Sequence, residues 1–359
     1  MNKIDNVNGP SPKGKSGAYC GLLAVFLLLF VSPVDAQPAE RDPDHFIFFG
    51  LERDRIREAS FLESPGIAGA QLKYTWRELE PVEGAYAFDS LRADLEFLEA
   101  RGRRLFVQVQ DVSFDSAIVN VPRYLMEKSR YGGGVARTYA IEGDDEFTAR
   151  GDGWVARRWD PAVRVRFIAM LRALGRAFDG RLEGINLAET AIDFGESGAL
   201  HPEGFTFEGY AESIREIMSA AREAFPGSHV IQYANFMPGE WLPWTDNGYL
   251  RGVYAHAEAL GVGVGGPDLL PHRPGQRNHS YPLISERSPA VVAGVAVQDG
   301  NLEAVDPATG RPVTVGELAR FAVDDLHLDY IFWGTQEPFY TEEILPWLSE
   351  RANLGGSRH

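Results

Sequence analysis

Short apolar segments that end in a polar or aromatic side chain recur along the chain, roughly every 30 to 50 residues, with amphipathic stretches between several of them. In one such stretch, from residue 161 to 178, Val163, Phe167 and Leu171 lie on one helical stripe. The apolar segments are predicted to be buried strands, over residues 46–51, 67–74, 105–109, 182–190, 229–234, 261–265, 291–297 and 329–333. This alternation predicts an α/β fold, a single (β/α)8 TIM barrel whose strand carboxyl ends form the active-site face.

The connection between the third and fourth predicted strands, residues 112–160, is too long for an ordinary barrel loop. It contains the run Gly132–Gly134 together with Trp154 and Trp159. Because long ordered loops in compact domains usually serve function, we expect this insertion to form a lid or wall of the cleft. The alternative is a mobile surface loop.

The first 36 residues have the pattern of a secretory signal peptide, with three lysines followed by the uncharged apolar run 21–31. Small residues precede the expected cleavage after Ala36, so the mature protein is predicted to be secreted or periplasmic. An uncleaved anchor is the alternative, but the apolar run is short for a bilayer span and no stable membrane anchor is expected. A lipoprotein is disfavoured because Cys20 precedes the apolar run. Residues 37–359 show no linker or repeat and are predicted to form one barrel domain.

Composition excludes several classes of function. Cys20 is the only cysteine, so the mature chain can contain no disulfide, cysteine nucleophile or cysteine-bound metal. The formal net charge is −16, and it becomes −17 when residues 1–36 are removed. Such an acidic chain is poorly suited to bind nucleic acid or an anionic membrane. The sequence pattern carries no signal for an oligomeric state.

The predicted strand ends are rich in carboxylates, amides and aromatic rings and poor in histidine. They comprise Glu52, Trp76, Gln108, Gln110, Asp111, Glu189, Asn235, Asp268, Gln298, Asp299, Trp333 and Glu337. The histidines do not cluster at these ends, which argues against a metal-dependent hydrolase. No Gly-x-Ser-x-Gly elbow and no phosphate-binding glycine loop is present. Neither a metal nor a cofactor is therefore expected.

This composition suits carbohydrate chemistry. Glycoside hydrolysis needs one carboxylic acid to protonate the leaving oxygen and a second carboxylate as base or nucleophile. Glu189, at the end of the fourth strand, is the first candidate for the acid; a structural capping or salt-bridged residue is the alternative. Amides can bind sugar hydroxyls and aromatic rings can stack on sugars, which gives as candidate substrate-binding residues Trp76, Gln108, Gln110, Asn235, Gln298, Trp333 and Trp241. Trp241 could equally anchor its own loop.

Residues 76–88 read W-x-x-x-E-P-x-x-G-x-Y-x-F and are followed by Asp89-Ser90-Leu91. This segment resembles the one that follows the second strand in clan-A glycoside hydrolases, and the likeness in architecture extends over residues 44–350. The resemblance implies a barrel glycosidase in which Glu189 is the acid/base. It also implies that Trp333 is the aromatic residue found at the end of the eighth strand.

The chain departs from the clan pattern at two places. Ala188 stands where these enzymes usually have an asparagine before the acid/base, and Asn186 lies three positions before Glu189. After the seventh strand, where the nucleophilic glutamate is expected, the chain has Gln298-Asp299.

Asp299 is the first candidate for the second carboxylate, with Asp268 and Glu337 as rivals. Because an aspartate side chain is shorter than glutamate, Asp299 would widen the gap to Glu189 and favour an inverting reaction. A simple turn at Asp299-Gly300 is the competing interpretation.

The sequence therefore predicts an exported O-glycosyl hydrolase that acts on an oligo- or polysaccharide. A non-catalytic carbohydrate-binding barrel is the first alternative, because the glutamate after the seventh strand is missing. A polysaccharide lyase with Tyr281 or His279 as base is the second.

Overall fold

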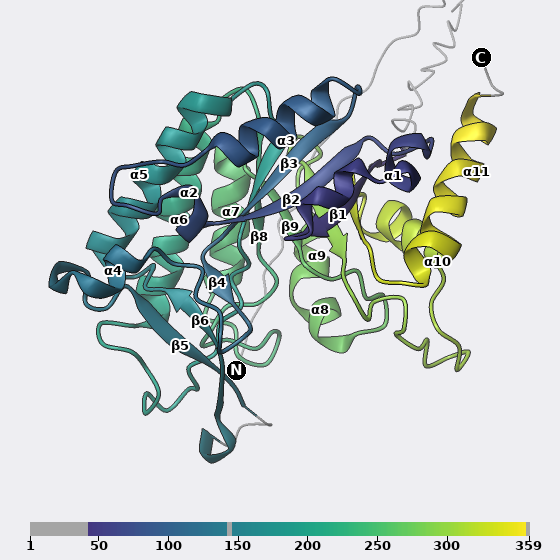
Figure 1. Ribbon diagram of the computed structural model, residues 1–359. Helices are drawn as coiled ribbons and strands as arrows, with labels where there is room; N and C mark the ends of the chain where they lie inside the picture. Colours follow the sequence, from purple (N-terminus) through teal and green to yellow (C-terminus); the bar gives the residue numbers. More distant parts are fainter. Residues whose placement is uncertain (1–41, 142–145, 357–359) are drawn as a thin grey trace, which may run out of the picture. The chain divides into compact units, whose positions relative to one another are not determined.

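The computed structural model describes residues 42–141 and 146–356, so the predicted signal peptide lies outside the described residues. Within these residues, eight parallel strands close into a barrel, as predicted (Figure 1). They are β1 (Asp44–Gly50), β2 (Gly69–Thr75), β3 (Arg104–Gln110), β7 (Gly184–Leu187), β8 (His229–Tyr233), β9 (Gly263–Gly266), β10 (Ala293–Val297) and β11 (Tyr330–Gly334). Each strand pairs with its sequence neighbour in the barrel, and β1 closes the ring on β11.

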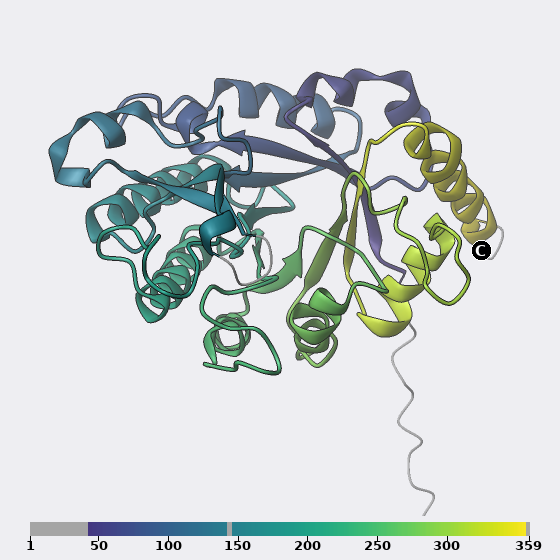
Figure 2. The same cartoon turned by 90° about the horizontal axis from the view of Figure 1, so that it is seen from below.

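Helices connect most of the strands and lie outside them (Figure 2). The longer ones are α3 (Asp89–Glu99), α5 (Pro161–Phe178), α6 (Phe207–Ala224), α7 (Tyr249–Leu260) and α11 (Leu345–Gly356). Shorter helical segments are η1 (Arg53–Arg57), α1 (Ala59–Glu63), α2 (Trp76–Leu79), α4 (Arg123–Glu127), η2 (Ser129–Tyr131), η3 (Glu146–Thr148), α8 (Pro274–Asn278), α9 (Ser280–Ser285), α10 (Val315–Arg320), η4 (Phe321–Asp325) and η5 (Tyr340–Ile344). Local signals explain where several begin. The side chain of Asp160 accepts hydrogen bonds from the first backbone N–H groups of α5, and Thr314 and Glu317 form a capping box at α10.

The insertion between β3 and α5 contains a small antiparallel sheet that the sequence pattern did not reveal. In its described part, the strands β4 (Val112–Ser113), β6 (Arg150–Ala156) and β5 (Val135–Ala140) are hydrogen-bonded in that order. Gly132–Gly134 form the turn that leads into β5, with φ angles of 55°, 90° and 70° that other residues adopt at a cost. The insertion is therefore a folded element.

The barrel interior changes from apolar to polar towards the carboxyl ends of the strands. A buried cluster fills its lower part, formed by Phe46, Phe106, Ile231, Tyr233, Ala296, Tyr330 and Phe332. Next to this cluster, Gln71 Nε2 donates hydrogen bonds of 3.0 Å to both Asn186 Oδ1 and Tyr233 Oη. The apolar cluster provides the packed core of the barrel, and the polar side chains begin the floor of its mouth.

Candidate active site

Glu189 follows β7 by two residues, at the carboxyl end of the barrel. Its backbone is fixed from two sides: Arg158 Nη1 donates to the carbonyl oxygen of Glu189 at 3.1 Å, and the N–H of Thr190 donates to the carbonyl of Tyr233 at 3.1 Å. Its carboxylate is oriented by Asn235, whose Nδ2 donates to Glu189 Oε2 at 2.7 Å. Glu189 and Asn235, which the sequence suggested separately as acid and as substrate-binding residue, thus lie together at the carboxyl end of the barrel.

Arg158, which donates to the backbone of Glu189, forms a buried ion pair with Asp111. The guanidinium donates to both carboxylate oxygens, at 2.6 and 2.8 Å, and the two side chains are only 1% and 4% exposed. Arg158 also donates to the Tyr210 hydroxyl at 2.9 Å, and that hydroxyl donates to the carbonyl of Thr190 at 3.0 Å. Burial alone would lower the pKa of Arg158, but the Asp111 carboxylate raises it above its usual value.

Glu189 has a pKa raised from 4.5 to about 7. Burial is the main cause, and the negative charge of Asp268 adds to it. The hydrogen bond from Asn235 and the charges of Lys73 and Arg158 act in the opposite direction. The side chain therefore holds a proton near neutral pH, as a general acid must.

The three candidates for the second carboxylate occupy different environments. Asp268 follows β9, and its charge acts on Glu189; its Oδ1 accepts a 3.0 Å hydrogen bond from Asn301 Nδ2. Asp299 is exposed in a turn completed by Gly300 at φ 84°. Glu337 is also exposed, and its Oε2 accepts a 2.7 Å hydrogen bond from the Thr341 hydroxyl. The structure thus brings Asp268 into the electrostatic neighbourhood of Glu189, and it gives Asp299 and Glu337 exposed positions.

Several buried amides at the barrel mouth have oxygen atoms without a hydrogen-bond partner among the described residues. These atoms are Oε1 of Gln108, Oε1 of Gln110 and Oδ1 of Asn235, in side chains that are 5–7% exposed. Gln110 Nε2 donates to the carbonyl of Val112 at 3.0 Å, and Gln298 is partly buried after β10. Buried polar groups are normally hydrogen-bonded, so such unpaired oxygens are suited to accept hydrogen bonds from the hydroxyls of a ligand.

The prediction that Trp76 and Trp333 bind substrate is wrong, because both rings are buried outside the barrel mouth. Trp76 is fully buried in α2, where its Nε1 donates to Glu80 at 3.0 Å and its ring packs on Phe167. Trp333 is fully buried too, and its Nε1 donates to His45 Nδ1 at 3.1 Å. Neither ring offers a face to a substrate.

Trp241, in contrast, is half exposed and lies parallel to Phe236, with ring centroids 5.7 Å apart. Both rings line a cavity of about 300 Å³, formed with the loops after β7 and β8. Phe114 and Tyr139, which belong to the insertion, also line this cavity. The insertion therefore contributes to the wall of a cavity near the carboxyl ends of the strands.

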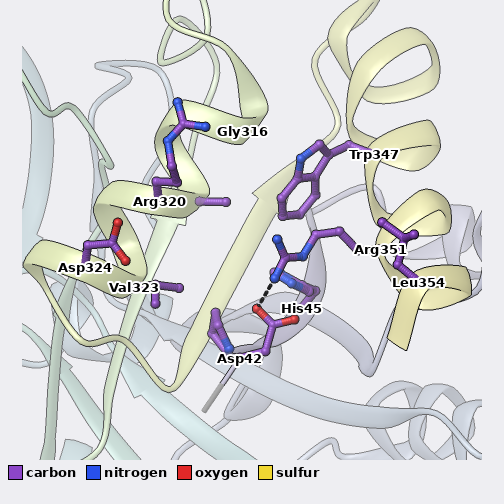
Figure 3. A pocket seen from close by; sticks show the side chains of 11 residues that line it. Asp42, His45, Gly316, Arg320, Val323, Asp324, Trp347, Arg351 and Leu354 are labelled. Carbon is purple, nitrogen blue, oxygen red and sulfur yellow. Dashed lines mark hydrogen bonds and ion pairs between the residues drawn. The ribbon is translucent and has the colours of Figure 1, made fainter. Parts of the chain in front are cut away.

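A larger cavity, of about 570 Å³, lies near the amino end of β1 (Figure 3). Its lining includes His45, Trp347 and the ion pair between Asp42 and Arg351. In parallel barrels the chemistry takes place at the carboxyl ends of the strands, so this cavity is not the candidate active site.

Among the described residues, no group of three or more histidine, cysteine, aspartate or glutamate side chains is arranged to hold a metal ion. Across residues 42–141 and 146–356, no helix has both the length and the apolar character needed to span a membrane.

No protein-family model and no curated protein matches the sequence. Solved structures do share the fold. The catalytic domain of β-amylase from Paenibacillus polymyxa is similar with a TM-score of 0.56 and 7% identity, over 87% of this chain and 99% of that one. GH5_18 from Streptomyces cattleya, solved in complex with GlcNAc, is similar with a TM-score of 0.50 and 14% identity, over 82% of this chain and 71% of that one. The resemblance to the barrels of clan-A glycoside hydrolases is thus confirmed at the level of the fold.

Proposed function

We propose that this chain is an exported glycoside hydrolase that cleaves O-glycosidic bonds of an oligo- or polysaccharide. The observation that carries the proposal is Glu189, a buried strand-end carboxyl group with a pKa of about 7 that feels the charge of a second acidic residue, Asp268. Unpaired amide oxygens at the carboxyl ends of the strands and a cavity lined by Trp241 and the insertion provide the kind of surface that sugars bind. The barrel fold is compatible with this chemistry but does not by itself imply it.

In the proposed reaction, protonated Glu189 donates its proton to the glycosidic oxygen as the bond to the leaving sugar breaks. Asp268 is the second carboxylate and acts as nucleophile or as the base that activates water. Asn235 holds the Glu189 carboxyl in a fixed orientation through its 2.7 Å hydrogen bond. The amides of Gln108 and Asn235 accept hydrogen bonds from substrate hydroxyls.

The lyase alternative needs Tyr281 or His279 as base, and both side chains make hydrogen bonds within the protein. The Tyr281 hydroxyl accepts from the N–H of Leu270 at 2.7 Å and donates to the carbonyl of Asp268 at 3.0 Å. His279 Nε2 accepts a hydrogen bond from the N–H of Leu242 at 2.9 Å. Its Nδ1 forms a 2.8 Å hydrogen bond with the carbonyl of Gly275. Both side chains are thus engaged in organising their own loops. A binding protein without turnover is separated from an enzyme by the assay below.

Hydrolysis is tested by incubating the purified protein with a panel of oligo- and polysaccharides and measuring the release of reducing ends. Replacing Asp268 with asparagine is expected to lower kcat/KM by about 100-fold or more, because the second carboxylate is lost. Asp299→Asn is the matched control, since it removes the same charge from an exposed turn, and its kcat/KM should stay within about twofold of the wild type. If Asp299→Asn causes the larger loss, Asp268 is not the second carboxylate. If the wild type releases no reducing ends from any substrate that it binds, the barrel is a binding protein.

The pH dependence of kcat/KM is expected to follow the proton on Glu189. Activity should fall as the pH rises above about 7, since only the protonated carboxyl can donate. The hydrogen bond from Asn235 favours the ionised form, so Asn235→Ala should raise the pKa of Glu189 and move the alkaline limb to higher pH. The measurement is a pair of pH profiles on one substrate. An alkaline limb that stays in place, or moves to lower pH, would contradict the assigned contact.

A further inference from the structure

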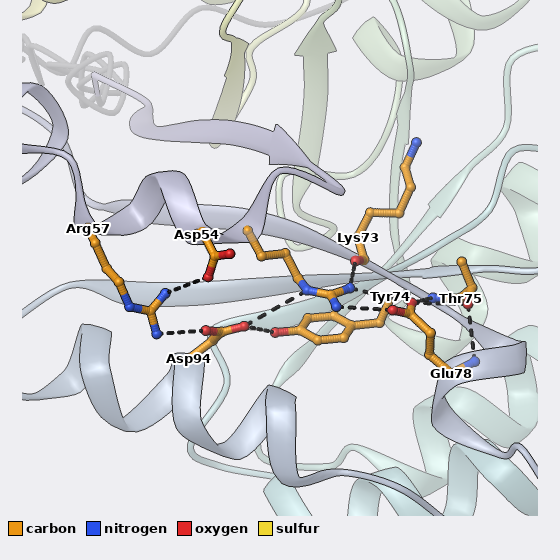
Figure 4. A network of polar contacts seen from close by, with 8 residues as sticks. Asp54, Arg57, Lys73, Tyr74, Thr75, Glu78 and Asp94 are labelled. Atoms are coloured by element: carbon orange, nitrogen blue, oxygen red, sulfur yellow. Dashed lines mark hydrogen bonds and ion pairs between the residues drawn. The ribbon is translucent and has the colours of Figure 1, made fainter.

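Lys73 points into the barrel mouth from the inner face of β2. Side chains alternate along a strand, and Gln71, two residues earlier, reaches Asn186 and Tyr233 inside the barrel. Lys73 Nζ lies 5.4 Å from the centre of the Phe48 ring, which packs against the interior aromatic cluster. Figure 4 shows the Lys73 side chain directed away from the polar network around Tyr74.

The ammonium group of Lys73 has no hydrogen bond and no ion pair with any described residue, although the residue is partly buried. Two arginines of η1 behave differently. Arg53 donates to Glu78 at 3.0 Å. Arg57 donates to Asp94 at 3.3 Å (Figure 4). The stem of Lys73 is partly buried while its ammonium group stays accessible at the barrel mouth, where it can meet an anionic group of a ligand.

The groups that act on the charge of Lys73 include the ring of Phe48 and the carboxyl of Glu189. The carboxyl that acts on it electrostatically is Glu189, and that group is protonated in the form of the protein that can donate a proton. Burial lowers the pKa of Lys73, and the charge of Glu189, when that group is ionised, acts in the opposite direction. Gln108 pairs with Lys73 in register on β3, and its buried Oε1 is also without a partner among the described residues.

We propose that Lys73 binds an anionic substituent, a carboxylate or a sulfate ester, on the sugar ring at the barrel mouth, while Gln108 accepts a hydrogen bond from a neighbouring hydroxyl. The inference rests on the proposed function for the position of the sugar beside Glu189. An ammonium group is a compact charge that forms strong charge-assisted hydrogen bonds with anionic oxygens. The net negative charge of the chain does not oppose this, because surface charges are screened over about 8 Å at physiological salt.

The test measures binding by calorimetry to the Glu189→Gln protein, in which hydrolysis is suppressed. The probes, at millimolar concentration, are matched methyl glycosides of glucose and glucuronic acid, of galactose and galacturonic acid, and the 6-sulfates of the two hexoses. At least one anionic sugar should bind about 10- to 100-fold more tightly than its neutral counterpart. Adding Lys73→Gln should remove that preference and leave the neutral sugars unaffected within about threefold. The set of probes, uronic acids or sulfated hexoses, that loses more affinity in Lys73→Gln identifies the substituent as carboxylate or sulfate.

Two further variants keep the test decisive. Lys128 lies in the insertion and forms an exposed ion pair with Glu83. Lys128→Gln removes the same charge as Lys73→Gln, and it should leave the preference for anionic sugars unchanged. Lys73→Arg keeps the charge and should retain part of the preference, which guards against a folding defect in Lys73→Gln. Equal binding of neutral and anionic sugars, or a preference that survives Lys73→Gln, overturns the inference. Failure of all anionic probes to bind overturns it as well.

The outcome separates the inference from the proposed function. Anionic sugars that bind through Lys73 but are never cleaved by the wild type would refute hydrolysis and support the binding site. Cleavage of neutral sugars without an anionic preference would support hydrolysis and refute the role of Lys73.

Discussion

Replacing Glu189 with glutamine is expected to lower kcat by about 10²- to 10⁴-fold on substrates with a poor leaving group. Glutamine keeps the size of the side chain and can still meet Asn235, but it cannot donate a proton of suitable acidity to the glycosidic oxygen. An aryl glycoside needs less protonation, so the loss on such a substrate should be smaller. The measurement compares kcat on a natural-type oligosaccharide with kcat on a nitrophenyl glycoside.

Glu208→Gln is the control for this substitution, because Glu208 is exposed in the first turn of α6 and its neutralisation should leave kcat unchanged. An equal loss on both kinds of substrate would argue that Glu189 is not the proton donor.

The same glutamine should stabilise the fold at alkaline pH. The folded-state pKa of Glu189 lies near 7 and its ordinary value is 4.5, so folding favours the protonated form. The corresponding stability is fully present below pH 4.5 and is lost as the pH rises through about 7. Glu189→Gln should therefore gain about 1–3 kcal/mol over the wild type at pH 8 and little at pH 4.5. Urea denaturation at the two pH values measures the difference.

Replacing Arg158 with methionine is expected to reduce the free energy of unfolding by about 3–5 kcal/mol. The substitution leaves the Asp111 carboxylate buried without its two hydrogen bonds and removes the donor to the backbone of Glu189. Arg172→Met is the matched control, since Arg172 forms an exposed pair with Glu223 and should cost less than about 1 kcal/mol. Urea denaturation curves give both values.

The double variant Asp111→Leu, Arg158→Met tests whether the cost comes from the unpaired charge. Removing both partners should recover most of the lost stability, because no ion is left without its partner. Activity should stay low, since the carbonyl of Glu189 has still lost its donor. If the double variant is no more stable than Arg158→Met, the loss of stability comes from lost packing of the side chains and not from an unpaired charge.

The strands and the acid candidate could be predicted from the sequence because both depend on local patterns. A buried apolar run followed by a glutamate marks β7 and Glu189 without knowledge of the rest of the chain. The side of the barrel that a residue faces was harder to predict. Parallel strands that are buried on both faces show no alternation of polar and apolar residues. The sequence of β11 therefore did not indicate whether Trp333 faces into or out of the barrel, and in the structure it faces out.

The contacts that organise the site depend on pairs distant in sequence. Arg158 and Asp111 lie 47 positions apart, and Arg158 stands in an insertion whose folded structure was not anticipated. The choice among the second carboxylates depends on loop conformation. Gly300 turns the chain so that Asp299 is exposed, while Asp268 is held by Asn301 near Glu189. The Asp-Gly pair signals the turn at Asp299, whereas no short-range pattern indicates the hydrogen bond between Asn301 and Asp268.

Arg158 belongs to the same insertion that forms a wall of the 300 Å³ cavity. If the proposed function holds, the insertion affects both the sugar-binding wall and the position of the proposed acid. Grafting a different insertion to alter which sugars are accepted would also exchange the donor that holds the carbonyl of Glu189. Engineering of the wall would have to preserve Arg158 and its pairing with Asp111, or supply another support for the proposed proton donor.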